Sequence, residues 1–170
     1  MQRQYYHEMD SPIGALTLVS DGTHLSAVHM RPGAEVLARQ PGEWRESADR
    51  LAQPHDQLAA YFAGDLREFT LELAPRGTPF QQRVWAALTR IPFGATWSYG
   101  ALAAAIGSPG HARAVGAANG QNPLAIIVPC HRVIGANGTL VGYGGGLERK
   151  RWLLEHEARC VATATQLALM

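Results

Sequence analysis

The four residues Ala74-Pro75-Arg76-Gly77 constrain the fold most, because charge, turn residues and hydrophobic pattern all change there. In residues 1–75 eleven acidic residues stand against six arginines, a net charge of −5. From residue 76 onward nine basic residues stand against three acidic ones, a net charge of +6. The chain has 170 residues, and domains typically run to ~100–150, so two small domains are the most it can hold. We expect domains at 1–75 and 76–160 and a tail at 161–170.

The second part also has an unusual distribution of charge. Residues 76–147 contain five arginines and no carboxylate. A segment without fixed negative charge is suited to face a polyanion such as nucleic acid. The alternative is an ordinary globular domain that happens to contain few charged residues and does not bind a polyanion.

The composition excludes several classes of protein. Hydrophobic residues make up 46% and charged residues 17%, which argues against disorder, collagen and coiled coil. The sequence has no run of about 18 apolar residues that could span a membrane, and residues 1–12 lack the apolar core of a secretory signal. The two cysteines, Cys130 and Cys160, form neither a disulfide framework nor a zinc-binding spacing. We therefore expect a reducing, cytoplasmic location.

Short segments of alternating hydrophobicity in the first part predict a sheet with one helix. Asp21-Gly22 predicts a turn between two strands. Pro54 and Gly64 frame a helical pattern, and Gly64 is its left-handed cap. Residues 31–53 contain several prolines and glycines and predict a loose loop. The expected strands are 4–9, 13–20, 25–30 and 66–73, and the expected helix is 55–63.

The second part begins with three short helices. Thr78-Pro79 places a cap before a proline in the first helical position, and Ser98 can cap a second helix that runs to Ile106. Residues 107–110 form a tight connector, and a third helix follows over about 111–119. Two short helices joined by a glycine-containing turn have the outline of a helix-turn-helix. Plain helix packing explains the same pattern equally well.

The run 122–128 is apolar and leads directly into Pro129-Cys130-His131-Arg132, which predicts a strand that ends at a positioned nucleophile. The thiolate is the reactive form of cysteine, and a nearby His or Arg lowers the pKa of the thiol from about 8.5. Successive residues of a strand point to opposite faces, so Cys130 and His131 can cooperate only if the chain turns there or a water bridges them. A lone cysteine is more often a small buried hydrophobe, and Cys160 keeps that interpretation.

A glycine-rich loop and a final helix follow the cysteine. Residues 142–146 read Gly-Tyr-Gly-Gly-Gly, which permits close approach of a ligand to the backbone; a flexible turn is the plain alternative. In the helix that begins at Leu147, the residues Lys150, Leu153 and Glu157 share one face. An inward Glu157 could orient a histidine as the third member of a nucleophile–base–orienter set. A surface glutamate is the alternative.

These motifs together resemble the O6-alkylguanine-DNA alkyltransferase family, and most closely its bacterial members. The resemblance rests on two runs, TPFQQRVWAALTRIPFGATWSYGALA and AVGAANGQNPLAIIVPCHRVIGANGTLVGYGGG. It implies an α/β fold, with a small ribonuclease-H-like α/β domain followed by a helical domain with a winged-helix-like helix-turn-helix. It also implies repair of DNA by direct reversal. The alkyl group of O6-alkylguanine, and of O4-alkylthymine, would pass from a flipped-out base to Cys130, once per molecule.

The resemblance also implies a role for each matching residue. Cys130 would accept the alkyl group, His131 would take the thiol proton through a water, and Glu157 would orient His131. Asn122 would hold the turn before the cysteine, and Tyr99 would donate a proton toward the guanine ring and help rotate the phosphate of the flipped nucleotide. Arg113 would enter the duplex where the base has left, beside a close-approach surface of Ala114, Ala117 and Ala118. The base pocket would be lined by Tyr143, Lys150 and the backbone of Cys130, Val133 and Gly144.

Further expectations concern partners and cofactors. The partner is double-stranded DNA that contains an alkylated guanine, with no membrane and no obligate protein partner, and the protein is expected to be a monomer. Some members of the family hold zinc in the first domain with two cysteines. Because this chain has no cysteine before Cys130, we expect neither a metal nor a cofactor, although His24 and His29 remain as ligand types. The alternatives are a lesion-binding helix-turn-helix protein with an inert Cys130, and a cysteine hydrolase that turns over repeatedly.

Overall fold

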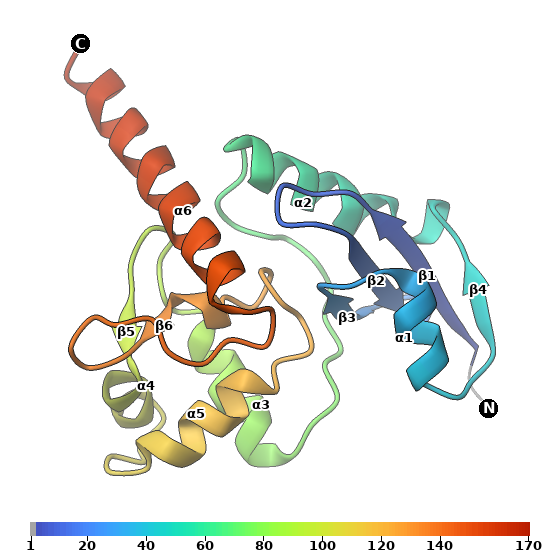
Figure 1. Ribbon diagram of the computed structural model, residues 1–170, viewed down its shortest axis with the longest axis horizontal. Coiled ribbons are helices and arrows are strands. Elements are labelled where there is room, and N and C mark those ends of the chain that lie inside the picture. Colours follow the sequence, from blue (N-terminus) through green and yellow to red (C-terminus); the bar gives the residue numbers. More distant parts are fainter. Residues whose placement is uncertain (1–2) are drawn as a thin grey trace. The chain divides into compact units, whose positions relative to one another are not determined.

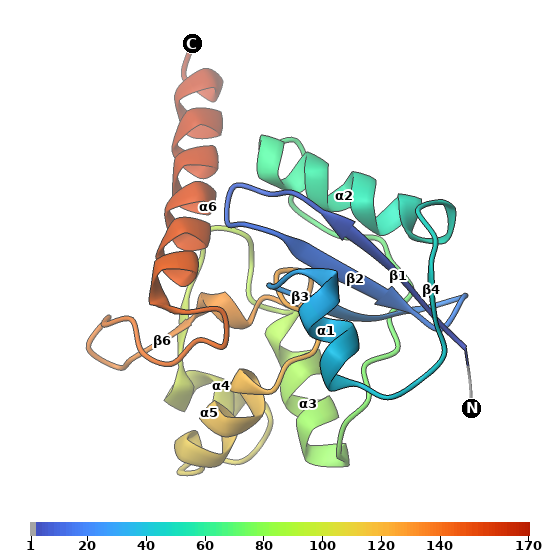
Figure 2. The same ribbon diagram turned by 45° about the vertical axis from the view of Figure 1, so that its right-hand side comes forward.

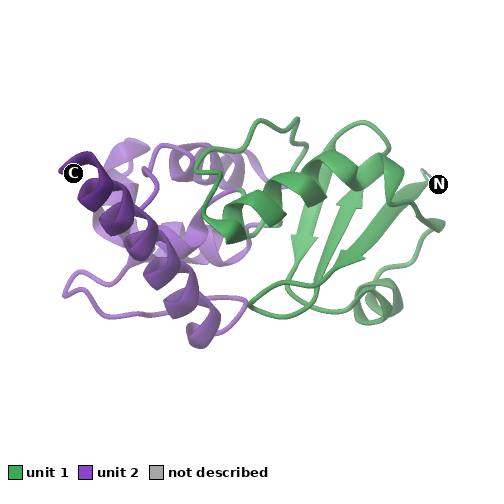
Figure 3. Cartoon of the chain, turned by 90° about the horizontal axis from the view of Figure 1, so that it is seen from above, with its two compact units in different colours: residues 1–76, 123–127 green, residues 77–122, 128–170 purple. Residues whose placement is uncertain are grey.

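The computed structural model describes residues 3–170 and divides them into two compact units (Figure 3). Unit 1 comprises residues up to Arg76 together with Pro123–Ile127, and unit 2 comprises Gly77–Asn122 and Val128–Met170. The change of unit at residues 76 and 77 coincides with the change in charge and pattern. The return of Pro123–Ile127 to unit 1 was not expected from the sequence. Each unit has its own buried hydrophobic core.

Unit 1 is built on a four-stranded sheet in the order β3-β2-β1-β4. The strands are β1 (Gln4–Met9), β2 (Leu16–Ser20), β3 (Leu25–His29) and β4 (Trp44–Glu46). Strand β2 pairs antiparallel with β1 and β3, whereas β4 pairs parallel with β1. Every residue of β2 is buried, which is expected of a central strand covered on both faces. Helix α2 (Ala52–Ala63) runs along the sheet (Figure 2) and ends at Gly64, whose φ of 84° confirms the predicted left-handed cap.

The segment 31–53 is more ordered than the sequence predicts. It holds helix α1 (Gly33–Arg39), strand β4 and a 3-10 turn (Asp49–Leu51). The first helical N–H of α1, at Gly33, donates to the carboxylate of Glu8 on β1. In β4 the ring of Trp44 packs edge-on against Tyr6 at 6.2 Å. These contacts join residues that are distant along the chain. The prediction of a loose loop over 31–53 was wrong because it considered only the local content of proline and glycine.

The strand predicted at 66–73 is also absent within the described chain. Only Leu73 makes a bridge, parallel to Leu25, and the rest of the segment is extended or bent without a ladder. Its backbone instead meets side chains of α2. The Gln57 amide accepts from the Thr70 N–H at 2.9 Å and donates to the Thr70 hydroxyl at 3.1 Å. A side chain therefore replaces the neighbouring strand that the hydrophobic pattern had suggested.

Unit 2 is mainly helical (Figure 1). Its helices are α3 (Pro79–Leu88), α4 (Tyr99–Ala105), α5 (Ala112–Gly120) and α6 (Leu147–Ala168). Thr78 caps α3 through a reciprocal capping box with Gln81, and Ser98 caps α4, as the sequence predicted. Two short strands, β5 (Trp97–Ser98) and β6 (Val133–Ile134), pair in parallel beside the helices.

Helices α4 and α5 pack on each other and on α3, which holds the predicted helix-turn-helix together. The Trp85 indole on α3 donates to the Ala118 carbonyl at 2.9 Å, and the Arg83 guanidinium donates to the Ile106 carbonyl at 2.7 Å. The predicted tail at 161–170 is not a separate segment, because α6 continues to Ala168. None of the helices within residues 3–170 is long and apolar enough to cross a membrane.

Candidate active site

The segment before Cys130 is not the strand that the sequence predicted. Residues 123–128 form consecutive turns, with a single bridge between Leu124 and Val28. Cys130 begins a 3-10 turn, η2 (Cys130–Arg132), so the chain does bend where the cysteine and the histidine meet. An apolar run of this length predicts either a strand or any other buried segment, because periodicity alone does not separate them.

Two asparagine side chains hold this bend. Asn122 Nδ2 donates to the Val128 carbonyl at 2.8 Å, as expected of a residue that fixes the turn. Asn119 Nδ2, at the end of α5, donates to the Cys130 carbonyl at 3.4 Å. No sequence pattern indicated Asn119, which lies in a run of small residues with helical spacing. The backbone carbonyls on both sides of the Cys130 side chain are therefore held by side chains of unit 2.

The Cys130 thiol lies in a site that does not favour its charged form. The residue is only 6% exposed, and burial raises the pKa of the Cys130 thiol. A hydrogen bond from the Asn122 side chain and the charge of Lys150 act in the opposite direction. Because burial outweighs both, the thiol needs a base to become a nucleophile at neutral pH.

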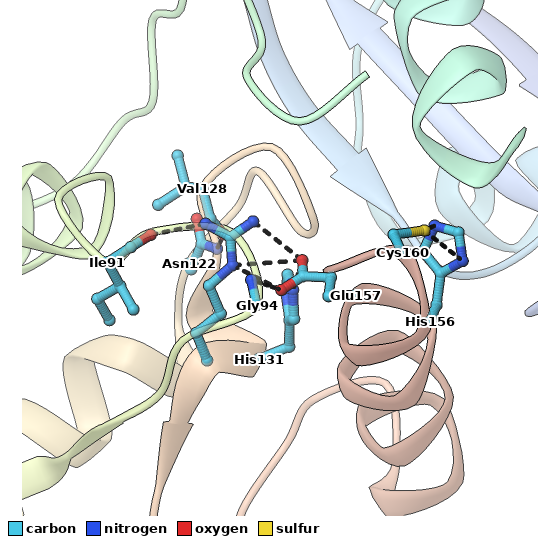
Figure 4. Close-up of polar contacts among 9 residues, drawn as sticks. Ile91, Gly94, Asn122, Val128, His131, His156, Glu157 and Cys160 are labelled. Carbon is cyan, nitrogen blue, oxygen red and sulfur yellow. Dashed lines mark hydrogen bonds and ion pairs between the residues drawn. The ribbon is translucent and has the colours of Figure 1, made fainter. Parts of the chain in front are cut away.

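His131, which follows Cys130 in the chain, forms a buried pair with Glu157 (Figure 4). His131 Nε2 lies 2.8 Å from Glu157 Oε1, and both side chains are fully buried. Burial lowers the pKa of His131 despite the neighbouring carboxylate, so the imidazole is neutral at pH 7. With Nε2–H donated to Glu157, the lone pair lies on Nδ1, a buried atom that has no hydrogen-bond partner among residues 3–170.

Glu157 is ionised because several donors converge on it. Burial alone would raise the pKa of Glu157, but the hydrogen bonds and charges of His131 and Arg132 lower it to about 2. Its Oε2 atom also accepts from the Gly94 N–H at 3.1 Å. The residue thus lies on the inward face that it shares with Lys150 and Leu153, and the alternative of a surface glutamate is wrong.

Arg132 is a member of this cluster that sequence reasoning did not assign. Its guanidinium donates to both carboxylate oxygens of Glu157, at 3.0 Å from Nε and 2.9 Å from Nη2, and Nη1 donates to the Ile91 carbonyl at 2.7 Å. Residues 76–147 contain no carboxylate, so an arginine that is buried there must find its acid in residues 1–75 or in the last helix. That charge pattern was the available signal.

Tyr99 and Lys150 converge on the loop that follows the cysteine. The Tyr99 hydroxyl and the Lys150 ammonium both donate to the Val141 carbonyl at 3.0 Å, and Lys150 also donates to the Val133 carbonyl. Burial lowers the pKa of Lys150 and raises that of Tyr99. The carbonyl of Val133, expected at the base pocket, is thus engaged by Lys150. Farther along the loop Tyr143 is half-buried, and burial raises its pKa well above the ordinary value.

The predicted DNA-facing residues of α5 do not all reach the surface. Arg113, Ala114 and Ala117 are exposed. Ala118 is only 3% exposed, and its carbonyl accepts the indole hydrogen bond from Trp85. Ala118 therefore packs against α3, and its inclusion in the close-approach surface was wrong. Helical spacing places Ala114 and Ala117 together, while Ala118 lies on the inner face with Val115.

The remaining candidates lie apart from this cluster. His24 contacts Asp21 and Glu72 through different ring nitrogens, at 3.4 and 3.8 Å. Within residues 3–170 no group of three His, Cys, Asp or Glu side chains could hold a metal ion. Cys160 lies 4.0 Å from the ring of His156, away from the side of α6 that carries Glu157 (Figure 4).

This arrangement is suited to nucleophilic chemistry. A buried thiol, a neutral histidine with an available lone pair and an ionised orienting carboxylate are the parts needed to make and use a thiolate. They stand in the same unit as a helix-turn-helix with an exposed arginine. Unit 2 therefore combines a thiol that can act as a nucleophile, Cys130, with a helix-turn-helix, which is a motif typical of DNA-binding proteins.

Comparison with family models accounts for both units. Residues 4–75 match the model described as 6-O-methylguanine DNA methyltransferase, ribonuclease-like domain. Residues 79–159 match the model described as 6-O-methylguanine DNA methyltransferase, DNA binding domain. Together these matches cover most of the chain and leave only short stretches outside them.

Similar proteins were found over nearly the whole length. The methylated-DNA–protein-cysteine methyltransferase of Mycobacterium bovis is 56% identical, covering 90% of this chain and 92% of that protein. The protein of the same name from Methanosarcina acetivorans is 49% identical, covering 92% and 99%. The crystal structure of Mycobacterium tuberculosis OGT in complex with DNA superposes with a TM-score of 0.85 at 54% identity, covering 92% and 94%.

Proposed function

Because the chain belongs to the 6-O-methylguanine DNA methyltransferase family, we propose that Cys130 is the residue that accepts the alkyl group. The protein is a methylated-DNA–protein-cysteine methyltransferase that repairs DNA by direct reversal. It moves the alkyl group of O6-alkylguanine in double-stranded DNA onto a cysteine of its own chain. The observation that carries the assignment to Cys130 is its place next to the buried His131–Glu157 pair.

The reaction begins with deprotonation of the thiol. His131 is neutral, and its Nδ1 lone pair takes the Cys130 proton through a bridging water. The Nε2–H group stays hydrogen-bonded to Glu157, whose negative charge stabilises the imidazolium that forms. Arg132 holds the carboxylate in place with two hydrogen bonds, so the orientation of His131 is fixed before substrate arrives.

The thiolate then displaces the base in a single substitution. A bond forms between the Cys130 sulfur and the alkyl carbon, while the bond from that carbon to guanine O6 breaks. The electron pair of the broken bond goes to the guanine, which takes up one proton from the Tyr99 hydroxyl and remains in the DNA as an ordinary neutral base. The proton that His131 took from the thiol then restores the Tyr99 hydroxyl through water. The product is a thioether, which has no thiol left to ionise, so each molecule acts once. The same chemistry extends to O4-alkylthymine.

Access to the alkyl carbon requires the base to leave the stack, at a cost of a few kcal/mol. We assign DNA contact to α5, where the exposed Arg113 fills the gap left by the base. The small side chains of Ala114 and Ala117 let the helix approach the backbone of the minor groove. The arginines of residues 76–147, a segment that contains no carboxylate, attract the phosphates of the DNA backbone.

The loop after the cysteine forms the wall of the base pocket in this proposal. Tyr143 and Gly144 line the pocket, and Lys150 holds the loop through the Val141 carbonyl. Tyr99 gives up its hydrogen bond to Val141 and turns its hydroxyl toward the guanine ring when the base enters. A reducing compartment, the cytoplasm, follows from the need for a free thiol at Cys130.

The stoichiometry of methyl transfer tests the proposal. We expect excess duplex DNA with one O6-methylguanine to give a burst capped at one methyl group per protein molecule, and Cys130→Ala to give none. Cys160→Ala is the matched control and should react like the parent. Repeated turnover would indicate a cysteine hydrolase, and DNA binding without any transfer would indicate a lesion-binding module.

A further inference from the structure

The backbone that leads into Cys130 contains two γ-turns of opposite hand. In the first, the Ile127 N–H donates to the Ala125 carbonyl at 2.9 Å, and the central residue Ile126 has φ of 74°. In the second, the Cys130 N–H donates to the Val128 carbonyl at 2.8 Å, and the central residue Pro129 has φ of −81° and ψ of 62°. The form with positive φ is rare and strained, whereas the other form is common.

Ile126 is an improbable residue for the strained turn. It is the single non-glycine residue with positive φ among residues 3–170, and a β-branched side chain disfavours that conformation strongly. Strain of this kind persists only where surrounding structure determines the backbone, and it concentrates at functional sites. The Ile126 side chain is fully buried, so its packing offsets the cost of the turn.

The path of the chain shows what requires the turn. Residues 123–127 leave unit 2, pair with β3 through the hydrogen bond from Val28 N–H to the Pro123 carbonyl, and return. The two ends of this excursion are joined by the Asn122 side chain, which donates to the Val128 carbonyl. Five residues must therefore go out and come back between ends linked by one side chain. A three-residue reversal at Ile126 meets that requirement.

The Val128 carbonyl connects the reversal to the acceptor. It accepts from both Asn122 Nδ2 and the Cys130 N–H, at 2.8 Å each. A carbonyl has two lone pairs and can serve both donors only while Val128 keeps its orientation. If the turn at Ile126 relaxed, Val128 would rotate, and the Cys130 backbone would lose the bond that sets its position.

We infer that Ile126, through its strained γ-turn, is a positioning residue for the acceptor Cys130. The inference rests on the proposed function of Cys130. Ile126 touches no reacting atom in this account. It acts through the turn, which places the cysteine before substrate binds, and preorganisation of this kind governs the rate of a displacement.

Paired substitutions separate strain from packing. Ile126→Ala and Ile126→Gly both remove the side chain, but only glycine adopts positive φ without penalty. The positive φ favours glycine roughly 5- to 30-fold, and the larger backbone entropy that glycine loses on folding opposes this about 2- to 5-fold, so the unfolding equilibrium constant of the glycine variant should be roughly 2- to 10-fold smaller than that of the alanine variant. Ile127 is also buried and has an ordinary φ, so Ile127→Ala and Ile127→Gly serve as the control. There the order should reverse by about 2- to 5-fold.

The functional measurement is the rate of methyl transfer per folded molecule at saturating duplex DNA with one O6-methylguanine. We expect Ile126→Gly to react about tenfold faster than Ile126→Ala, because alanine relaxes the turn and a 1 Å misplacement can cost up to ~10²-fold in rate. The half-saturating DNA concentration should be equal in the two variants, since α5 is untouched. A role confined to stability would leave the two rates equal.

Two results would overturn the inference. One is a more stable alanine variant at position 126, which would show that the turn is not strained. The other is an equal or faster rate in the alanine variant, which would show that the turn does not position the sulfur. Peptide mapping of the parent separates this failure from that of the proposed function. A methyl group on Cys130 with equal variant rates rejects Ile126 alone, whereas an unmodified Cys130 rejects the acceptor.

Discussion

Substitution of Glu157 by glutamine removes the charge on which the buried cluster depends. The carboxylate accepts from His131, Arg132 and the Gly94 N–H, and a glutamine offers one acceptor and an unwanted donor in its place. A pKa lowered from 4.5 to about 2 corresponds to roughly 3 kcal/mol of stability at neutral pH. Loss of one partner of a buried ion pair typically costs about 3–5 kcal/mol, which agrees.

The sign of the pH dependence follows from the lowered pKa. This contribution is fully present above the unfolded pKa of about 4.5 and is lost as the pH falls toward 2. The stability difference between parent and Glu157→Gln should therefore shrink from roughly 3 kcal/mol at pH 7 to roughly 1 kcal/mol at pH 3. Urea denaturation at the two pH values measures it.

The same substitution should slow the chemistry. His131 becomes a weaker base, so the apparent pKa for alkylation of Cys130 rises and transfer near neutral pH slows by ~10²–10⁴-fold, with partial recovery at higher pH. Glu155→Gln, an exposed change on the same helix, is the control. A pH–rate profile of Glu157→Gln that superimposes on those of the parent and the control would refute the role of the pair. It would leave Cys130 to be activated by the local backbone.

Three further substitutions test other parts of the account. Arg113→Ala should slow repair of duplex DNA far more than reaction with the free O6-alkylguanine base, because only the duplex requires extrusion; equal losses would count against this role. Arg132→Lys should lose about 2–4 kcal/mol in urea denaturation, because an ammonium cannot replace the two-pronged guanidinium contact; an unchanged midpoint would refute it. Gly94→Ala should destabilise more than Gly107→Ala. Both glycines have positive φ, but a Cβ on Gly94 would lie 2.6 Å from Val161 Cγ2, whereas one on Gly107 meets nothing within 4 Å. Equal thermal midpoints for these two variants would contradict a close approach of Val161 on α6 to Gly94.

Local signals in the sequence predicted the helices of unit 2 well. The caps at Thr78 and Ser98 are made by the side chains that precede each helix, so a few neighbouring residues determine where α3 and α4 begin. The inward position of Glu157 follows from helical spacing with Lys150 and Leu153 in the same way. Features that depend on residues close together in the chain, such as helix caps and the face of a helix on which a residue lies, can therefore be predicted from the sequence.

The features that sequence reasoning missed depend on distant residues. Strand β4 exists because it pairs with β1, some forty residues earlier, and Arg132 is held by Glu157 on α6 and by the Ile91 carbonyl in the loop after α3. The apolar run before Cys130 is buried, which its composition indicates. It is folded as turns rather than as a strand, because its ends are joined by the Asn122 side chain and its first residues, Pro123 and Leu124, pair with β3.

Mapping of the modified cysteine tests the central claim most directly. The protein has two cysteines, the buried Cys130 and the half-exposed Cys160, so each molecule carries an internal comparison. After reaction with duplex DNA that contains O6-methylguanine, peptide mass analysis should place one methyl group on the peptide with Cys130 and none on the peptide with Cys160. A methyl group on Cys160, or an unmodified Cys130 in protein that has consumed the lesion, would contradict the account.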